Sequence, residues 1–108
     1  MITSRKRSTK SLPIKKVIAV DVDETLIING QINQGLIDWC ISMKAAGYIL
    51  MLWSARGQTH AERAASYTET ETLFDHIISK PGYIVDDKGW NWIKDTKVIN
   101  PIQNGMCL

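Results

Sequence analysis

The 108-residue sequence contains only two cysteines and three prolines, and its longest apolar segment is the six-residue run Tyr48–Trp53. A membrane-spanning helix needs about 20 consecutive apolar residues, so no span is expected. Cys40 and Cys107 are too few for a disulfide framework and lack metal-site spacing, so we expect free thiols in a reducing compartment. A secretory signal is not expected, because Asp21 interrupts the first apolar segment. These absences predict a cytoplasmic protein without membrane contact.

Acidic residues are absent from the first 16 positions, which carry six of the 13 lysines and arginines. The other 92 residues carry seven basic and eleven acidic residues, a net charge of −4. We interpret residues 1–13 as a basic, flexible, solvated arm and residues 14–108 as one domain. A more specific alternative is that the arm contacts nucleic-acid phosphates. A transit peptide is a weaker alternative. The six basic residues of the first 16 positions are Arg5, Lys6, Arg7, Lys10, Lys15 and Lys16.

Short apolar segments alternate with segments of helical periodicity. Val17–Val22 and Tyr48–Trp53 are typical of strands that are buried on both faces of a parallel sheet. Two parallel strands that are neighbours in a sheet need a crossover of about a dozen residues between them. The segments His76–Ser79 and Tyr83–Val85 lie too close in the chain to form such a pair. We expect Tyr83–Val85 in the parallel core and His76–Ser79 at an edge, where an antiparallel orientation stays open.

Two helices are expected between these strands. The first is Gln34–Ala46, with Asn33 as the N-cap and Gly47 as the stop signal. Its apolar face consists of Leu36, Ile37, Cys40 and Ile41. The second helix is Thr59–Thr68, with Thr59 as a candidate N-cap. A turn is expected at Asn29-Gly30. Strands that alternate with helices predict an α/β fold with a mainly parallel sheet.

Each apolar segment ends in a polar residue. Asp21 and Asp23 follow the first, Ser54 ends the second, Lys80 follows His76–Ser79, and the pair Asp86-Asp87 follows Tyr83–Val85. Ligands of open α/β sheets bind outside the carboxyl ends of the strands. Four carboxylates gathered there would repel one another, and Mg²⁺ with a lysine would relieve the conflict. Such a site suits an anionic, phosphate-like ligand.

The ordered set resembles the four motifs of the haloacid dehalogenase-like (HAD) superfamily. The first motif, D-x-D-x-T, is matched by Asp21, Asp23 and Thr25, and the other three are matched by Ser54, by Lys80 and by Asp86-Asp87. The resemblance covers about two thirds of the chain. It implies a small three-layer Rossmann-like fold and a Mg²⁺-dependent phosphomonoester hydrolase.

The resemblance also implies roles for the matched residues. Asp21 would attack phosphorus to form an aspartyl-phosphate, and Asp23 would act as general acid and then as general base. Ser54 and Lys80 would bind the phosphoryl oxygens. Mg²⁺ would be held by the Asp21 carboxylate, the Asp23 carbonyl and Asp86. Thr25 would tie down the loop, and Asp87 would orient Lys80 or a metal-bound water.

The spacing of the motifs leaves no room for a cap domain. An open site would admit a bulky substrate, such as a nucleic-acid end or another macromolecular phosphate, unless an oligomer covers it. Two alternatives remain: a non-catalytic module of the same fold that binds phosphate groups or nucleic acid, and a receiver-like domain that accepts phosphate on Asp21. Single motifs also have plain structural explanations, such as a helix cap at Asp86-Asp87. Arg56 and Arg63 follow Ser54 closely and could reach a substrate anion, but we expect them to be ordinary solvated charges. We expect His60 to be a surface or partly buried side chain.

Overall fold

The computed structural model describes residues 15–102, which form two units. The larger unit contains Lys16–Tyr83 and residues 99–102, and the other contains Lys15 and Ile84–Val98. The predicted arm at residues 1–13 lies outside the described residues, as does Cys107. No helix within residues 15–102 is long and apolar enough to cross a membrane.

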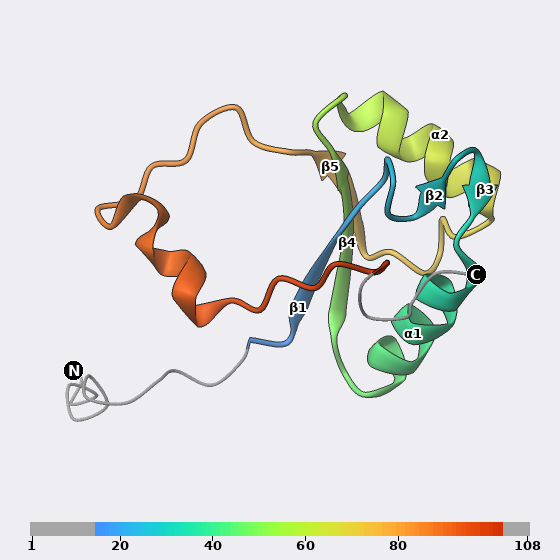
Figure 1. Ribbon diagram of the computed structural model, residues 1–108, viewed down its shortest axis with the longest axis horizontal. Coiled ribbons are helices and arrows are strands. Elements are labelled where there is room, and N and C mark those ends of the chain that lie inside the picture. Colours follow the sequence, from blue (N-terminus) through green and yellow to red (C-terminus); the bar gives the residue numbers. More distant parts are fainter. Residues whose placement is uncertain (1–14, 103–108) are drawn as a thin grey trace. The chain divides into compact units, whose positions relative to one another are not determined.

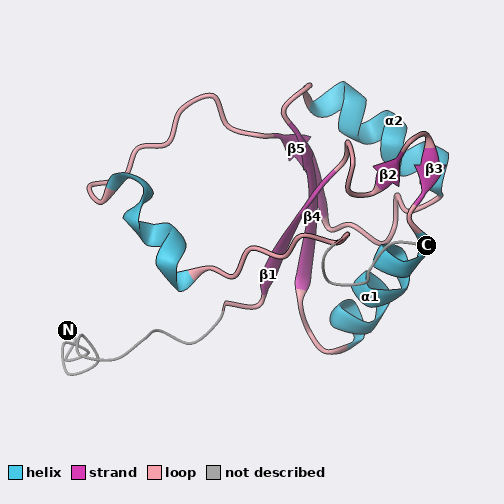
Figure 2. Cartoon of the chain, viewed as in Figure 1, coloured by secondary structure: helices cyan, strands magenta, loops and turns pink. Residues whose placement is uncertain are grey.

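The larger unit is built on a three-stranded parallel sheet. Its strands are β1 (Val17–Asp21), β4 (Ile49–Ser54) and β5 (His76–Ser79), in the order β1-β4-β5 (Figures 1 and 2). Asp21 pairs with Trp53, and Ser54 pairs with Ser79, so the carboxyl ends of the strands meet at one edge. The predicted α/β class with a mainly parallel sheet is confirmed.

The third strand is β5, and the prediction that Tyr83–Val85 fills this place is wrong. Tyr83–Val85 is not a strand, and Val85 is 99% exposed. The antiparallel alternative for β5 is also wrong. The chain between β4 and β5 includes a helix, which supplies the long crossover that parallel strands need. Apolar, β-branched composition alone did not distinguish the two segments.

Helices cover one face of this sheet. Alternate residues of β4 are buried: Leu50 and Leu52 are fully buried, whereas Ile49 is 45% exposed. The helices α1 (Gln34–Ala45) and α2 (Gln58–Thr68) both contact β4, and both lie on the same side of the strands in Figure 1. The expected burial of the strands on both faces is therefore wrong within this unit.

The helical boundaries follow local signals. The Asn33 side chain accepts a hydrogen bond from the N–H of Leu36 at 3.2 Å, which confirms the predicted N-cap of α1. Ile41, expected on the apolar face, is 52% exposed. It lies about 140° around the helix from Leu36, at the margin of the buried stripe. Helix α2 starts at Gln58 after Gly57 (φ 105°), so Thr59 is not its N-cap.

A small hairpin separates β1 from α1. The strands β2 (Ile27–Ile28) and β3 (Gln31–Ile32) pair antiparallel around Asn29-Gly30, the turn expected from the sequence. Both turn residues have positive φ values, 51° and 77°, which the Asn-Gly dipeptide tolerates well. Between Asp23 and β4, the described chain consists of this hairpin, α1 and short connections.

Candidate functional site

Asp21 and Lys80 meet at the carboxyl edge of the sheet. Asp21 is the last residue of β1, and Lys80 follows β5 directly. The Lys80 ammonium lies 3.2 Å from Asp21 Oδ1, and the two side chains are 38% and 35% exposed. The Lys80 ammonium also lies 5.8 Å from the centroid of the Trp53 ring. The structure therefore brings together the predicted nucleophile and the predicted phosphate-binding lysine.

Ser54 lies at the same edge, at the end of β4. Its carbonyl oxygen accepts the backbone N–H of Lys80 at 2.9 Å, which fixes the start of the lysine loop. Its hydroxyl oxygen accepts the backbone N–H of Arg56 at 3.0 Å. Ser54 is 1% exposed, yet a hydroxyl that accepts one bond still has its own proton to donate.

Asp23 lies in the turn after β1, and its carboxylate contacts helix α2. Asp23 Oδ1 lies 3.2 Å from Nε2 of His60 and 3.7 Å from Nη1 of Arg56. Sequence reasoning expected no functional role for either partner. The signal that could have found them is position: the loop and first helical turn after Ser54 begin at the same edge of the sheet as Asp23.

Thr25 is held within the loop through its backbone. Its N–H donates to the carbonyl of Val22 at 3.3 Å, and its carbonyl accepts from the side-chain amide of Asn33 at 3.0 Å. Asn33 is 2% exposed, and Leu26 of the same loop is fully buried. These contacts give the segment that carries Asp23 a fixed backbone.

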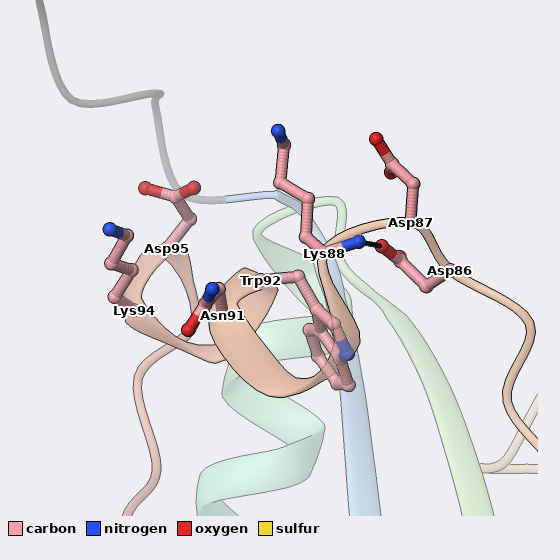
Figure 3. A pocket seen from close by; sticks show the side chains of 7 residues that line it. All are labelled: Asp86, Asp87, Lys88, Asn91, Trp92, Lys94 and Asp95. Atoms are coloured by element: carbon pink, nitrogen blue, oxygen red, sulfur yellow. Dashed lines mark hydrogen bonds between the residues drawn. The ribbon is translucent and has the colours of Figure 1, made fainter.

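Asp86 and Asp87 belong to the other unit, which is described by itself. They precede the 3-10 helix η2 (Gly89–Asp95), and the Asp86 carboxylate accepts the backbone N–H of Lys88 at 2.8 Å (Figure 3). This bond lies in the turn before η2. The N-cap of η2 is Lys88, without a side-chain cap bond, so Asp86 and Asp87 are not the helix cap that the sequence offered as an alternative. The metal-binding role of Asp86 and the supporting role of Asp87 stay predictions.

The same segment contains a pocket of about 520 Å³. Three acids and two lysines line it, so its charge is mixed. The indole N–H of Trp92 is buried there without a hydrogen-bond partner among the described residues. The lining residues are Asp86, Asp87, Lys88, Asn91, Trp92, Lys94 and Asp95 (Figure 3).

The oxygen donors of Asp21 and Asp23 have the chemistry that Mg²⁺ prefers. Among residues 15–102, no group of three or more His, Cys, Asp or Glu residues is arranged to hold a metal ion. Mg²⁺ commonly keeps several waters and binds through one or two carboxylates and a substrate phosphate. A magnesium site at this edge of the sheet therefore stays a prediction, with Asp21 and Asp23 as its ligands in the larger unit.

Comparison with known proteins gives one family. Residues 1–106 match the model of a family described as "Protein of unknown function (DUF705)". No curated protein and no solved structure matches the chain.

Proposed function

The chain belongs to the DUF705 family, and for this member we propose the function of a Mg²⁺-dependent phosphomonoester hydrolase. The observation that carries the proposal is the 3.2 Å pair of Lys80 and Asp21 at the carboxyl edge of the sheet, beside Ser54. A carboxylate that attacks a phosphate dianion needs a cation close to both groups. The 3.2 Å contact between Lys80 and Asp21 supports this role for Lys80.

The first chemical step is assigned to Asp21. One oxygen of its carboxylate attacks phosphorus, the bond from phosphorus to the ester oxygen breaks, and an aspartyl-phosphate forms. Asp23 donates its proton to the departing alkoxide, which leaves as an alcohol. Lys80 and the Ser54 hydroxyl hold the phosphoryl oxygens while their charge is redistributed.

Water completes the cycle. The Asp23 carboxylate takes a proton from water, the resulting nucleophile attacks phosphorus, and the bond to Asp21 breaks to release inorganic phosphate. Mg²⁺, held by the Asp21 carboxylate and the Asp23 carbonyl, would supply further positive charge to the phosphoryl oxygens. Thr25 would keep the loop in place.

The proposal includes the finer fold, a Rossmann-like architecture of the HAD type; the larger unit, with its sheet and the helices on one face, accounts for two of the three layers of that architecture. Its support is the order of a parallel sheet whose first strand ends in Asp21 and whose next two strands end beside Ser54 and Lys80. The half-exposed side chains of Asp21, Asp23 and Lys80 support an open site. An open site suits a bulky phosphate ester such as a nucleic-acid end, with the basic residues of the N-terminal arm as an additional phosphate contact.

Phosphate release tests the proposal directly. Wild type, Asp21→Asn and the surface control Asp38→Asn are assayed with Mg²⁺ and with a chelator. The substrates are p-nitrophenyl phosphate, mononucleotides and oligonucleotides phosphorylated at the 3′ or 5′ end. We expect release that needs Mg²⁺, persists in Asp38→Asn and disappears in Asp21→Asn. Folded wild type that releases no more phosphate than Asp21→Asn on every substrate would overturn the proposal and favour a non-catalytic phosphate-binding module.

A further inference from the structure

The His60 side chain of helix α2 contacts the carboxylate of Asp23. His60 lies in the first turn of α2, and its Nε2 is 3.2 Å from Asp23 Oδ1. The following residue, Ala61, is fully buried, as is Ala65 one turn later, so the helix is seated on the core. His60 is 27% exposed in its side chain, whereas Asp23 is 48% exposed. The better-covered histidine therefore restrains the more exposed acid.

The chemistry of the pair fixes the direction of the bond. An ionised carboxylate only accepts hydrogen bonds, so His60 must donate through a proton on Nε2. This one hydrogen bond therefore selects the rotamer of Asp23.

An acid in a solvent-exposed turn gains most from such a restraint. Proton transfer requires the donor oxygen within hydrogen-bond distance of the departing oxygen, and small displacements lower the rate steeply. Arg56 approaches the same Oδ1 atom at 3.7 Å, but its side chain is 67% exposed. His60 is therefore the more constrained of the two partners.

We propose that His60 is a positioning residue that holds Asp23 in the geometry needed for proton transfer to the leaving group; this rests on the hydrolase function proposed above. His60 acts through Asp23 and has no direct contact with the reacting phosphate. The alternative is a surface ion pair that contributes slightly to stability and nothing to the chemistry.

The leaving group distinguishes these roles. p-Nitrophenolate leaves without protonation, whereas an alkoxide from an alkyl phosphate needs the proton of Asp23. The values of kcat/KM for both esters are compared in wild type, His60→Leu and His60→Gln, because kcat/KM reports the step in which the leaving group departs. Asp23→Asn gives the pattern of a lost acid, and Thr59→Ala is the control on the same helical turn.

We expect His60→Leu to lower kcat/KM for the alkyl phosphate by about 10–100-fold and to change the value for p-nitrophenyl phosphate by less than about 3-fold. The amide of His60→Gln can donate to Asp23, so this variant should recover most of the loss. Circular dichroism checks folding, and His60→Ala replaces the leucine variant if the latter does not fold.

The outcomes separate the two proposals. If wild type hydrolyses neither ester, the hydrolase function itself fails. If wild type hydrolyses both esters and folded His60→Leu lowers both values equally, or neither, the positioning role is overturned. Loss confined to the alkyl ester, with recovery in His60→Gln, supports it.

Discussion

Asp75 and Leu50 are joined by two reciprocal hydrogen bonds, each 2.8 Å long. The N–H of Asp75 donates to the Leu50 carbonyl, and the N–H of Leu50 donates to the Asp75 carboxylate. The pair lies just before β5 and aligns His76 with Met51, so that Ser79 falls opposite Ser54. A contact at one end of the strand therefore sets the position of Lys80 at the other end.

Replacing Asp75 by asparagine should reduce stability in a pH-dependent manner. The N–H of Leu50, and then the ammonium of Lys44, hold the pKa of Asp75 below its ordinary value. A lowered pKa means that the ionised group stabilises the fold above its unfolded pKa of about 3.9, and that this contribution is lost as the pH falls further. The difference in Tm between wild type and Asp75→Asn should therefore shrink between pH 7 and pH 3. A constant difference, or an equal effect in Asp38→Asn, would contradict this account.

Lys80→Met should separate activity from stability. We expect kcat/KM for phosphate esters to fall by about 10²–10³-fold, the typical cost of a lost charge-stabilising group. The free energy of unfolding should change by less than about 1 kcal/mol, because the ion pair with Asp21 is half-exposed. Lys16→Met removes an exposed lysine at the opposite end of β1, and it should leave kcat/KM unchanged. Equal losses in both variants would indicate a general charge effect.

Two isoleucines of α1 provide a matched test of the core. Ile37 is 6% exposed and Ile41 is 52% exposed. Ile37→Ala should lower the free energy of unfolding by about 2–5 kcal/mol, because it leaves a cavity under the helix. Ile41→Ala should cost less than about 1 kcal/mol. Urea unfolding of both variants measures the difference, and similar costs would show that Ile41 is packed after all.

The thiol of Cys40 should be protected in the native protein. Burial raises the pKa of this thiol to about 11 from an ordinary value of 9.0. In a Cys107→Ser background, Ellman's reagent at pH 8 should react with Cys40 only after urea is added. Because the neutral thiol is favoured in the folded state, stability should be intact below pH 9 and should decline as the pH rises toward 11. Rapid native reaction would show that α1 opens readily.

Residues at strand ends were the part of the candidate site that the sequence revealed well. Asp21, Ser54 and Lys80 each follow an apolar segment, and the edge where parallel strands end collects such residues. His60 carries no such mark, since its contact with Asp23 depends on how the turn after β1 folds toward α2. The distance between this turn and α2 is set by tertiary packing, which the pattern of a single sequence does not show.

The choice of the third strand shows a second limit. Tyr83–Val85 and His76–Ser79 have similar strand propensity, and the chain spacing excluded only their use as parallel neighbours. The two hydrogen bonds between Asp75 and Leu50 favour His76–Ser79. Those bonds form only when the strands are already close, so local composition could not reveal them.

Both pairings of the central strand β4 join distant parts of the chain: Val17 pairs with Ile49, and Met51 pairs with His76. During synthesis the hairpin and α1 can form as they emerge from the ribosome, and β1 can then pair with β4, whereas the third strand must wait for residues 76–79. The Asp21–Lys80 pair is thus among the last features to assemble. A chain interrupted before Lys80 would display the carboxylate of Asp21 without this counter-charge.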